Sequence, residues 1–287
     1  MRVLVTGGDG QLGTELCLLL RERADEAIAP DLEELDFLRA DTIAAQIDRH
    51  RPDWVINCAA YTQVDKAEEE EDKAFRINRD GAREVARAAR AAGAGLAHIS
   101  TDFIFGGERC RPYREDDAAN PLGVYGQSKW EGEQAVREEM PDALVLRTAW
   151  VYGVHGANFV RTMLRLAGER EELRVVADQV GTPSWTRDIG QALLRLIDLR
   201  ETGTFHFTDE GVASWYDFAC AIVEEARALG YDLKTQQVTP IATEDYPTPA
   251  TRPAWSVLDK AKVRPLLETP IPHWRDSLRA MLRELKS

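Results

Sequence analysis

The feature that most constrains the fold is a glycine-rich turn close to the N-terminus. Residues 2–6 are mostly β-branched or apolar, which is typical of a short buried strand. Glycines follow at positions 7, 10 and 13, and a helical pattern begins at Thr14. Gly7 permits a tight turn, Gly10 lets the backbone approach a pyrophosphate, and Gly13 allows the helix to pack closely on the strand. Because a helix N-terminus also offers free N–H groups to an anion, the turn predicts a dinucleotide-binding site.

The rest of the first half alternates between strand and helix patterns. Further strands are expected at 27–30, 54–57, 96–100 and 144–147, with helices at 42–50 and 81–92 between them. This alternation predicts an α/β fold, a Rossmann-type doubly wound parallel sheet with helices on both faces. The alternation breaks near residue 150. We therefore expect an NAD(P)-binding domain over 1–150 and a smaller, mainly substrate-binding lobe over 151–287, with about 185–207 returning to the main sheet.

Composition excludes several classes of function. The 287 residues carry a net charge of −13, whereas general nucleic-acid binding needs a basic surface. The four cysteines lie far apart and have no metal-ligand spacing, so no metal site is expected and a reducing compartment is the simple interpretation. The sequence has no signal peptide and no apolar run of roughly 20 residues. We expect a cytoplasmic protein without membrane or nucleic-acid partners.

Three segments after the turn are candidates for cofactor contacts. Asp31 would accept hydrogen bonds from an adenosine ribose and disfavour a 2′-phosphate, although a plain loop carboxylate fits equally well. Residues 35–37 are similar to the segment with which such domains contact adenine, and Asp36 would be the acceptor. Small residues at 58–60 end a strand at the edge where α/β sheets bind ligands. Simple close packing also explains them.

Tyr125 and Lys129 are the candidates for acid–base chemistry. A spacing of four residues places both side chains on one face of a helix. A lysine ammonium beside a phenol lowers the pKa of the phenol, and such a tyrosine can protonate a carbonyl oxygen that receives hydride. An isolated pair of this kind usually lies on a solvated face. Thr101 and Asp102 follow a strand, where they form either an ordinary turn or part of a site.

Two further residues leave alternatives open. Trp150 would wall a sugar pocket or cap the core. Arg252 ends a proline-rich loop over 240–253, and its guanidinium suits either a bidentate phosphate contact or a surface salt bridge.

Taken together, the motifs resemble a known family. They are Thr-Gly-Gly-x-Gly-Gln-Leu-Gly (6–13), Asn-Cys-Ala-Ala-Tyr-Thr-x-Val-Asp-Lys-Ala-Glu (57–68), Ser-Thr-Asp-Phe-Ile-Phe (100–105), Tyr-Gly-x-x-Lys (125–129) and Arg-Thr-Ala-Trp-Val-Tyr-Gly (147–153). This set is similar to the extended short-chain dehydrogenase/reductases and, among them, to the dTDP-4-dehydrorhamnose reductases. The resemblance covers essentially the whole chain.

The resemblance implies an activity and a set of site residues. The activity is the reduction by NADH or NADPH of the C4 ketone of a dTDP-linked 4-keto-6-deoxyhexose. Tyr125 would donate the proton, Lys129 would tune its pKa, and Thr101 would hold the substrate oxygen. Asp102 and Trp150 would line the sugar site. The residues expected to contact the cofactor are Gly7, Gly10, Gln11, Leu12, Asp31, Asp36, Phe37, Ala60, Tyr61, Thr62, Tyr125 and Lys129.

Two other functions remain open at this point. Nucleotide-sugar dehydratases of the same superfamily carry a Glu directly after the Thr-Asp pair, where this chain has Phe103, and epimerases usually show a Ser-rich stretch there. A non-catalytic regulatory subunit is the third alternative. The intact Thr101, Tyr125 and Lys129 count against it.

Some relatives form dimers around a magnesium ion. Glu15 would be one carboxylate ligand, but Trp185, Thr186 and Arg187 match the acidic partner segment poorly. A Mg²⁺-dependent dimer is therefore not expected, while a homodimer without metal stays open. The choice between NADH and NADPH also stays open, with Asp31 favouring NADH.

Overall fold

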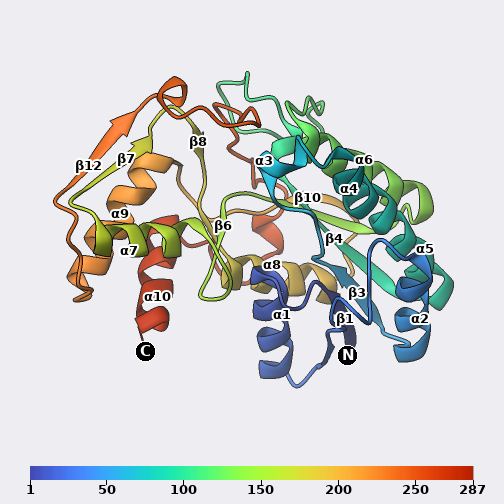
Figure 1. The fold of residues 1–287 in the computed structure, drawn as a ribbon. Helices are drawn as coiled ribbons and strands as arrows, with labels where there is room; N and C mark the ends of the chain where they lie inside the picture. The colour runs from blue at the N-terminus through green and yellow to red at the C-terminus, as the bar shows by residue number, and fades with distance from the viewer. Residues whose placement is uncertain (287) are drawn as a thin grey trace.

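A parallel sheet forms the centre of the larger lobe in the computed structural model, which describes residues 1–286 (Figure 1). Its strands lie in the order β2 (Glu26–Ile28), β1 (Arg2–Thr6), β3 (Trp54–Asn57), β4 (Gly95–Thr101), β5 (Leu144–Thr148) and β10 (Gly203–His206). Every neighbouring pair is parallel. From β1 the chain moves first to β2 on one side and then to β3 on the other. Ligands of such sheets bind where the order reverses, beyond the carboxyl ends of the strands.

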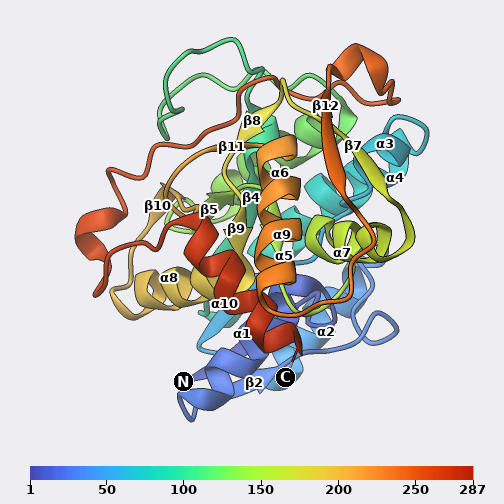
Figure 2. The same ribbon diagram turned by 90° about the vertical axis from the view of Figure 1, so that its left-hand side faces the viewer.

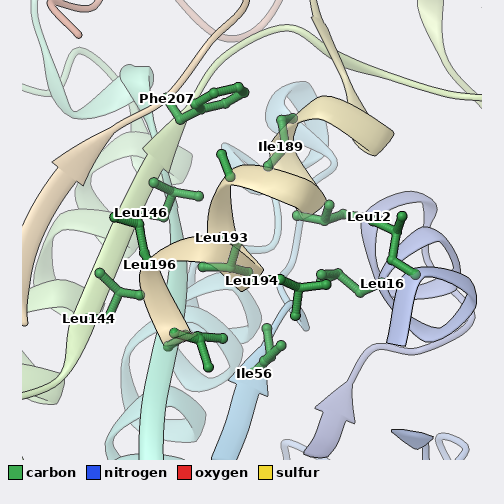
Figure 3. Packing of buried hydrophobic residues seen from close by; sticks show 14 of the residues in the cluster. Leu12, Leu16, Ile56, Leu144, Leu146, Ile189, Leu193, Leu194, Leu196 and Phe207 are labelled. Atoms are coloured by element: carbon green, nitrogen blue, oxygen red, sulfur yellow. The ribbon is translucent and has the colours of Figure 1, made fainter. Parts of the chain in front are cut away.

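The sheet is covered on both faces because successive strand residues point to opposite sides. In β1, Val3 and Val5 belong to one hydrophobic cluster and Leu4 to another. On the first face, α1 (Gln11–Glu22) and α8 (Thr186–Asp198) pack against each other and against the sheet. Figure 3 shows Leu16 of α1 and Leu193 of α8 in this layer. The predicted doubly wound α/β fold is confirmed.

The second face carries α2 (Ala40–His50), α5 (Ala82–Ala92) and α6 (Val124–Glu139). The expected helix over 81–92 is longer than its pattern indicated. It continues from α4 (Glu71–Phe75) through the π-helical segment η1 (Arg76–Gly81), and the short α3 (Val64–Ala67) precedes it. The 3-10 helix η2 (Asp102–Ile104) directly follows β4.

A smaller lobe lies beside the carboxyl edge of the sheet (Figures 1 and 2). Its helices are α7 (Phe159–Glu169), α9 (Trp215–Ala228) and α10 (Trp274–Lys286), which share one hydrophobic cluster. Its strands form the pairs β6 (Val151–Tyr152) with β9 (Ser184–Trp185), β7 (Glu172–Val176) with β12 (Gln237–Ile241), and β8 (Val180–Gly181) with β11 (Ala213–Ser214). The 3-10 helices η3 (Thr243–Asp245) and η4 (Arg264–Leu266) lie in the connections.

The chain crosses between the two lobes more than once. The segment 185–207 supplies α8 and the edge strand β10 to the main sheet. A second return, which the sequence did not indicate, brings Val263, Leu266 and Ile271 onto the core between α8 and the sheet. Within residues 1–286, none of the helices combines the length and the apolar character needed to span a bilayer.

Candidate active site

A cavity of about 840 Å³ lies between the lobes, at the carboxyl edge of the sheet. Its walls come from the turn after β1, the segments after β3, β4 and β5, the first turn of α6, and the small lobe. This is the edge where the reversed strand order opens a crevice. The position of the cavity therefore follows from the topology of the sheet.

The glycine turn forms one end of the cavity. Gly7 has a φ of +65°, and the N–H of Gly10 donates to the carbonyl oxygen of Gly7 at 3.0 Å. A Cβ at Gly13 would lie only 2.1 Å from the same oxygen, so the helix can pack this closely only on glycine. Gly10 is the N-cap of α1 and provides no side-chain cap, so the first N–H groups of the helix face the cavity.

Two buried polar atoms of the cavity support the presence of a ligand there. The side-chain oxygens of Gln11 and Thr148 are both buried, and neither has a hydrogen-bond partner among the described residues. Both residues line the cavity. Unpaired buried polar atoms are costly, and a polar ligand would satisfy them. The glycine turn and these atoms fit a dinucleotide.

Most of the residues that the sequence predicted to contact the cofactor line the cavity. Gly7, Gln11, Leu12, Asp31, Phe37, Ala60 and Thr62 line the cavity as expected. Asp36 and Tyr61 lie behind the lining. The carboxylate of Asp36 accepts a hydrogen bond from the N–H of Leu38 at 2.8 Å, and the hydroxyl of Tyr61 donates to Glu70 at 3.2 Å. These bonds occupy polar atoms of both residues, and their contact with a cofactor stays a prediction.

Thr101, Asp102 and Tyr125 meet at the centre of the cavity. Thr101 is the last residue of β4, and its hydroxyl donates a hydrogen bond to the carboxylate of Asp102 at 3.1 Å. Burial raises the pKa of Tyr125 to about 12, while a hydrogen bond with Thr101 lowers it and the Asp102 carboxylate raises it. The ring of Phe103 packs edge-on against Tyr125, with 5.4 Å between the ring centroids. Burial also raises the pKa of Asp102 to about 6.

The pKa shifts of Tyr125 and Lys129 differ from the expectation drawn from their spacing. The sequence predicted that the Lys129 ammonium lowers the pKa of Tyr125, but burial determines the direction of the shift for both groups. The Nζ of Lys129 donates to the carbonyl oxygen of Ile99 at 2.7 Å, and burial lowers the pKa of Lys129 to about 8 while Glu133 and Cys58 raise it. Both side chains are thus shifted towards their neutral forms.

A buried ion pair anchors the helix that carries these groups. The carboxylate of Glu133 accepts hydrogen bonds from Nε and Nη2 of Arg147 in β5, at 2.9 and 2.8 Å. Both residues are almost completely buried. Tyr125, Lys129 and Glu133 follow one another at intervals of four along one face of α6. The ion pair therefore fixes the helix face that presents Tyr125 and Lys129.

Aromatic side chains form the wall on the side of the small lobe. Trp150, which the sequence placed either at a sugar pocket or in the core, lines the cavity. Its indole stacks on that of Trp215, with centroids 3.5 Å apart, and Phe159 packs against Trp215 at 4.7 Å. Trp215 and Phe159 were not among the predicted site residues, although both line the cavity. Each opens a helix of the small lobe, but a contact across the lobes leaves no local sequence signal.

Arg252 forms an ion pair, one of the two alternatives that the sequence left open, and the phosphate contact stays a prediction. It lines the cavity, yet its guanidinium forms a bidentate ion pair with Asp65, through Nη1–Oδ1 at 2.9 Å and Nη2–Oδ2 at 2.7 Å. The N–H of Ala250 donates to the same carboxylate at 3.2 Å. The pair links α3 to the proline-rich loop. Arg252 is held at the rim of the cavity by a carboxylate of the chain itself.

Glu15, the candidate magnesium ligand, lies in a different setting from the one the resemblance suggested. It is buried, and Nη1 of Arg187 lies 3.3 Å from its Oε1. Burial raises the pKa of Glu15, whereas the charge of Arg187 lowers it. An arginine thus provides the positive charge beside this carboxylate. The expectation that no metal-dependent dimer forms stays a prediction.

Comparison with known proteins agrees with this geometry. The family model described as the RmlD substrate binding domain matches residues 1–287. The chain belongs to this family. The spore coat polysaccharide biosynthesis protein SpsK of Bacillus subtilis is 42% identical over 291 residues, covering 100% of this chain and 98% of that protein. The dTDP-4-dehydrorhamnose reductase of Aggregatibacter actinomycetemcomitans is 42% identical and covers 97% of each.

A solved structure extends the likeness to the whole fold. The dTDP-4-dehydrorhamnose reductase of Bacillus anthracis, in complex with NADP, superposes on this RmlD-family chain with a TM-score of 0.93 at 38% identity, covering 99% of both chains. Sequence and fold therefore agree over essentially the full length.

Substitutions at Gly10 and Gly13 should separate ligand binding from folding. A Cβ at Gly10 meets only the Gly7 carbonyl oxygen, at 3.2 Å, so Gly10→Val should fold but exclude a pyrophosphate from the turn. Gly13→Ala should destabilise the protein, since its Cβ would overlap the backbone of the turn. Thermal unfolding and cofactor titration by fluorescence check both effects. Unchanged cofactor affinity in folded Gly10→Val would remove the turn from the site.

Lys129→Met should stabilise the protein at neutral pH. Below pH 8 the folded state must bury the Lys129 ammonium, whose pKa is about 8 instead of its ordinary 10.5. Between these values the unfolded state binds more protons, so wild-type stability rises with pH. We expect the variant to gain about 1–3 kcal/mol at pH 7 and the gain to shrink from pH 8 to 10.5.

Urea unfolding at a series of pH values measures this difference. Lys262→Met is the matched control, because Lys262 is exposed and also donates to a backbone carbonyl, that of Thr204. A gain for Lys129→Met that does not change with pH would contradict the assignment.

Proposed function

We propose that the chain catalyses the NAD(P)H-dependent reduction of the C4 ketone of dTDP-4-dehydro-L-rhamnose to dTDP-L-rhamnose, a step in the biosynthesis of dTDP-rhamnose. One observation carries the proposal: a single cavity holds both an anion-binding glycine turn and a phenol that is hydrogen-bonded to a threonine. The relative in Aggregatibacter actinomycetemcomitans is named for this reduction and is similar over nearly its whole length.

The cofactor would occupy the end of the cavity formed by the glycine turn. Gly7, Gly10 and the N-terminus of α1 would hold the diphosphate, and Asp31 and Phe37 lie where the adenosine would reach. Bound NADH or NADPH would supply the hydride that reaches C4. Asp31 favours NADH because its charge repels a 2′-phosphate. The relative from Bacillus anthracis binds NADP, so steady-state kinetics with both cofactors is the direct comparison.

Tyr125 would provide the proton. Because its pKa is raised to about 12, the phenol is protonated at neutral pH and can act as an acid. As C4 receives hydride, the carbonyl oxygen becomes an alkoxide, which takes the phenolic proton and forms the product alcohol. The phenolate then recovers a proton from water. Thr101 would hold both the phenol and the substrate oxygen, and the charge of protonated Lys129 would favour the phenolate that results.

The sugar and its diphosphate would lie along the other walls. Asp102 and Trp150 line the cavity and would contact the hexose. Arg252 would exchange the Asp65 carboxylate for the diphosphate. The ring of Phe103 packs on Tyr125 at the place where a dehydratase would carry an acid, which disfavours that alternative.

We place the reaction in the cytoplasm. Cys17, Cys58, Cys110 and Cys220 are all free thiols, which suits a reducing compartment.

Tyr125→Phe should abolish turnover and leave binding of cofactor and sugar nucleotide largely intact. The ring still packs against Phe103, so only the hydroxyl is lost. General-acid help is worth about 10²–10⁴ in rate, and the loss should fall in kcat more than in KM. NADH and NADPH oxidation assays with dTDP-4-dehydro-L-rhamnose measure this loss.

Tyr231→Phe serves as the control, because the Tyr231 hydroxyl donates to the Leu282 carbonyl oxygen inside the small lobe. If Tyr125→Phe keeps more than about a tenth of the wild-type kcat, well above the range expected for a lost acid, Tyr125 is not the proton donor.

Arg252→Ala should raise KM for the nucleotide sugar more than it lowers kcat. Charge-assisted contacts to a diphosphate are worth roughly 1.5–3 kcal/mol and act in ground and transition states alike. Arg264→Ala is the control, since Arg264 also forms an ion pair with a carboxylate, that of Glu210, and does not line the cavity. An unaltered KM in Arg252→Ala would leave this arginine with only its structural ion pair to Asp65.

A further inference from the structure

Trp150 holds an unusual backbone conformation at the junction of the two lobes. Its φ of +47° lies in the left-handed region, which side chains other than glycine rarely adopt. The residue lies two positions after the end of β5 and directly before β6, and its indole contacts Trp215 of the small lobe. A strained residue keeps such a conformation only when its surroundings determine it. The contacts of the Trp150 indole should therefore explain how it is held.

Two neighbours hold the indole. A Cβ at Gly181 would lie 2.5 Å from the Trp150 ring, so β8 passes the ring more closely than any side chain would allow. The Trp215 indole covers the ring with an interplanar angle of 1° and a centroid distance of 3.5 Å. Trp150 is thus held by Gly181, which lies beside Cε2 and Nε1 of the ring, and by the Trp215 plane on one face.

Trp215 is itself rigidly placed. It is the first residue of α9, and Ser214 caps this helix in a reciprocal capping box with Asp217, with bonds of 3.0 and 2.9 Å. The strand that leads to it, β11, pairs with β8, which brings Ala213 opposite Gly181. Phe159 at the start of α7 supports Trp215 at an angle of 49°. The small lobe therefore fixes the position of the Trp215 indole against Trp150.

We propose that Trp215 is a positioning residue that holds the Trp150 indole as the wall against which the hexose ring of the substrate binds. This inference rests on the proposed function. A 6-deoxyhexose has apolar C–H groups and a methyl group that suit an aromatic wall. The nucleotide part of the substrate would lie beyond this wall, nearer to Arg252. Loss of Trp215 should therefore weaken recognition of the sugar and spare recognition of the nucleotide.

The experiment compares a sugar nucleotide with the same nucleotide lacking the sugar, and the difference in phosphate charge between them is the same for every variant. Calorimetric titration with dTDP and with dTDP-L-rhamnose gives two dissociation constants, and their ratio isolates the contribution of the hexose. Trp215→Ala should reduce this ratio by about five- to tenfold, the size of a typical aromatic contact, and change the affinity for dTDP itself by less than about twofold. Trp215→Phe should restore most of the ratio, because it keeps an aromatic plane.

Two controls separate positioning from general stability. Trp130→Ala removes an indole that packs in another cluster, against Ile104 and Tyr113, and should leave the ratio unchanged. If Trp215→Ala does not fold, Trp215→Leu provides the same comparison with more side-chain volume but no aromatic plane.

The possible results have distinct meanings. An unchanged ratio in Trp215→Ala, or an equal loss of affinity for both ligands, would overturn the positioning role. A wild-type protein that binds both ligands equally would overturn this inference alone, whereas failure to oxidise NADH or NADPH with dTDP-4-dehydro-L-rhamnose would overturn the proposed function and this inference with it.

Discussion

The buried ion pair between Glu133 and Arg147 fixes α6 against β5, and the geometry of the site depends on that contact. Burial alone would raise the pKa of Glu133, but the hydrogen bonds and charge of Arg147 lower it, so the pair remains ionised. Removal of Glu133 would leave the buried charge of Arg147 uncompensated, which is strongly destabilising, whereas Arg137 also contacts the Glu133 carboxylate, at 2.9 Å. Tyr125 lies two turns before Glu133 on the same face. The pair therefore sets how deeply the phenol reaches into the cavity.

Burial also governs the electrostatics of the candidate site, with opposite signs for its two central groups. It raises the pKa of Tyr125 and lowers the pKa of Lys129, so each is shifted towards its neutral form. For the phenol this is useful, since an acid must keep its proton until the oxygen of the substrate becomes basic. For Lys129, burial of the ammonium is unfavourable, and the Glu133 charge and the hydrogen bond to the Ile99 carbonyl oxygen offset this. A sequence gives the spacing of such a pair but not its degree of burial.

The parts that the sequence predicted well are those with a local physical cause. The glycine turn and the strand pattern each act through neighbouring residues, and both are present in the structure. The parts that it missed depend on contacts between distant segments. Trp215 reaches the cavity, and Arg252 meets Asp65 of α3, only because later segments of the chain fold over the sheet edge.

The late return of the chain to the main sheet has a consequence for biosynthesis on the ribosome. Strand β10 completes the sheet beside β5, and α8 covers the face that α1 leaves open. Val263 and Ile271 then close the same layer. A nascent chain of 150 residues would lack α8 and β10. The hydrophobic face that α8 covers would then be exposed, and β5 would be an unpaired edge strand. The nucleotide-binding half cannot finish folding as an independent N-terminal unit, and nearly the whole chain must leave the exit tunnel first.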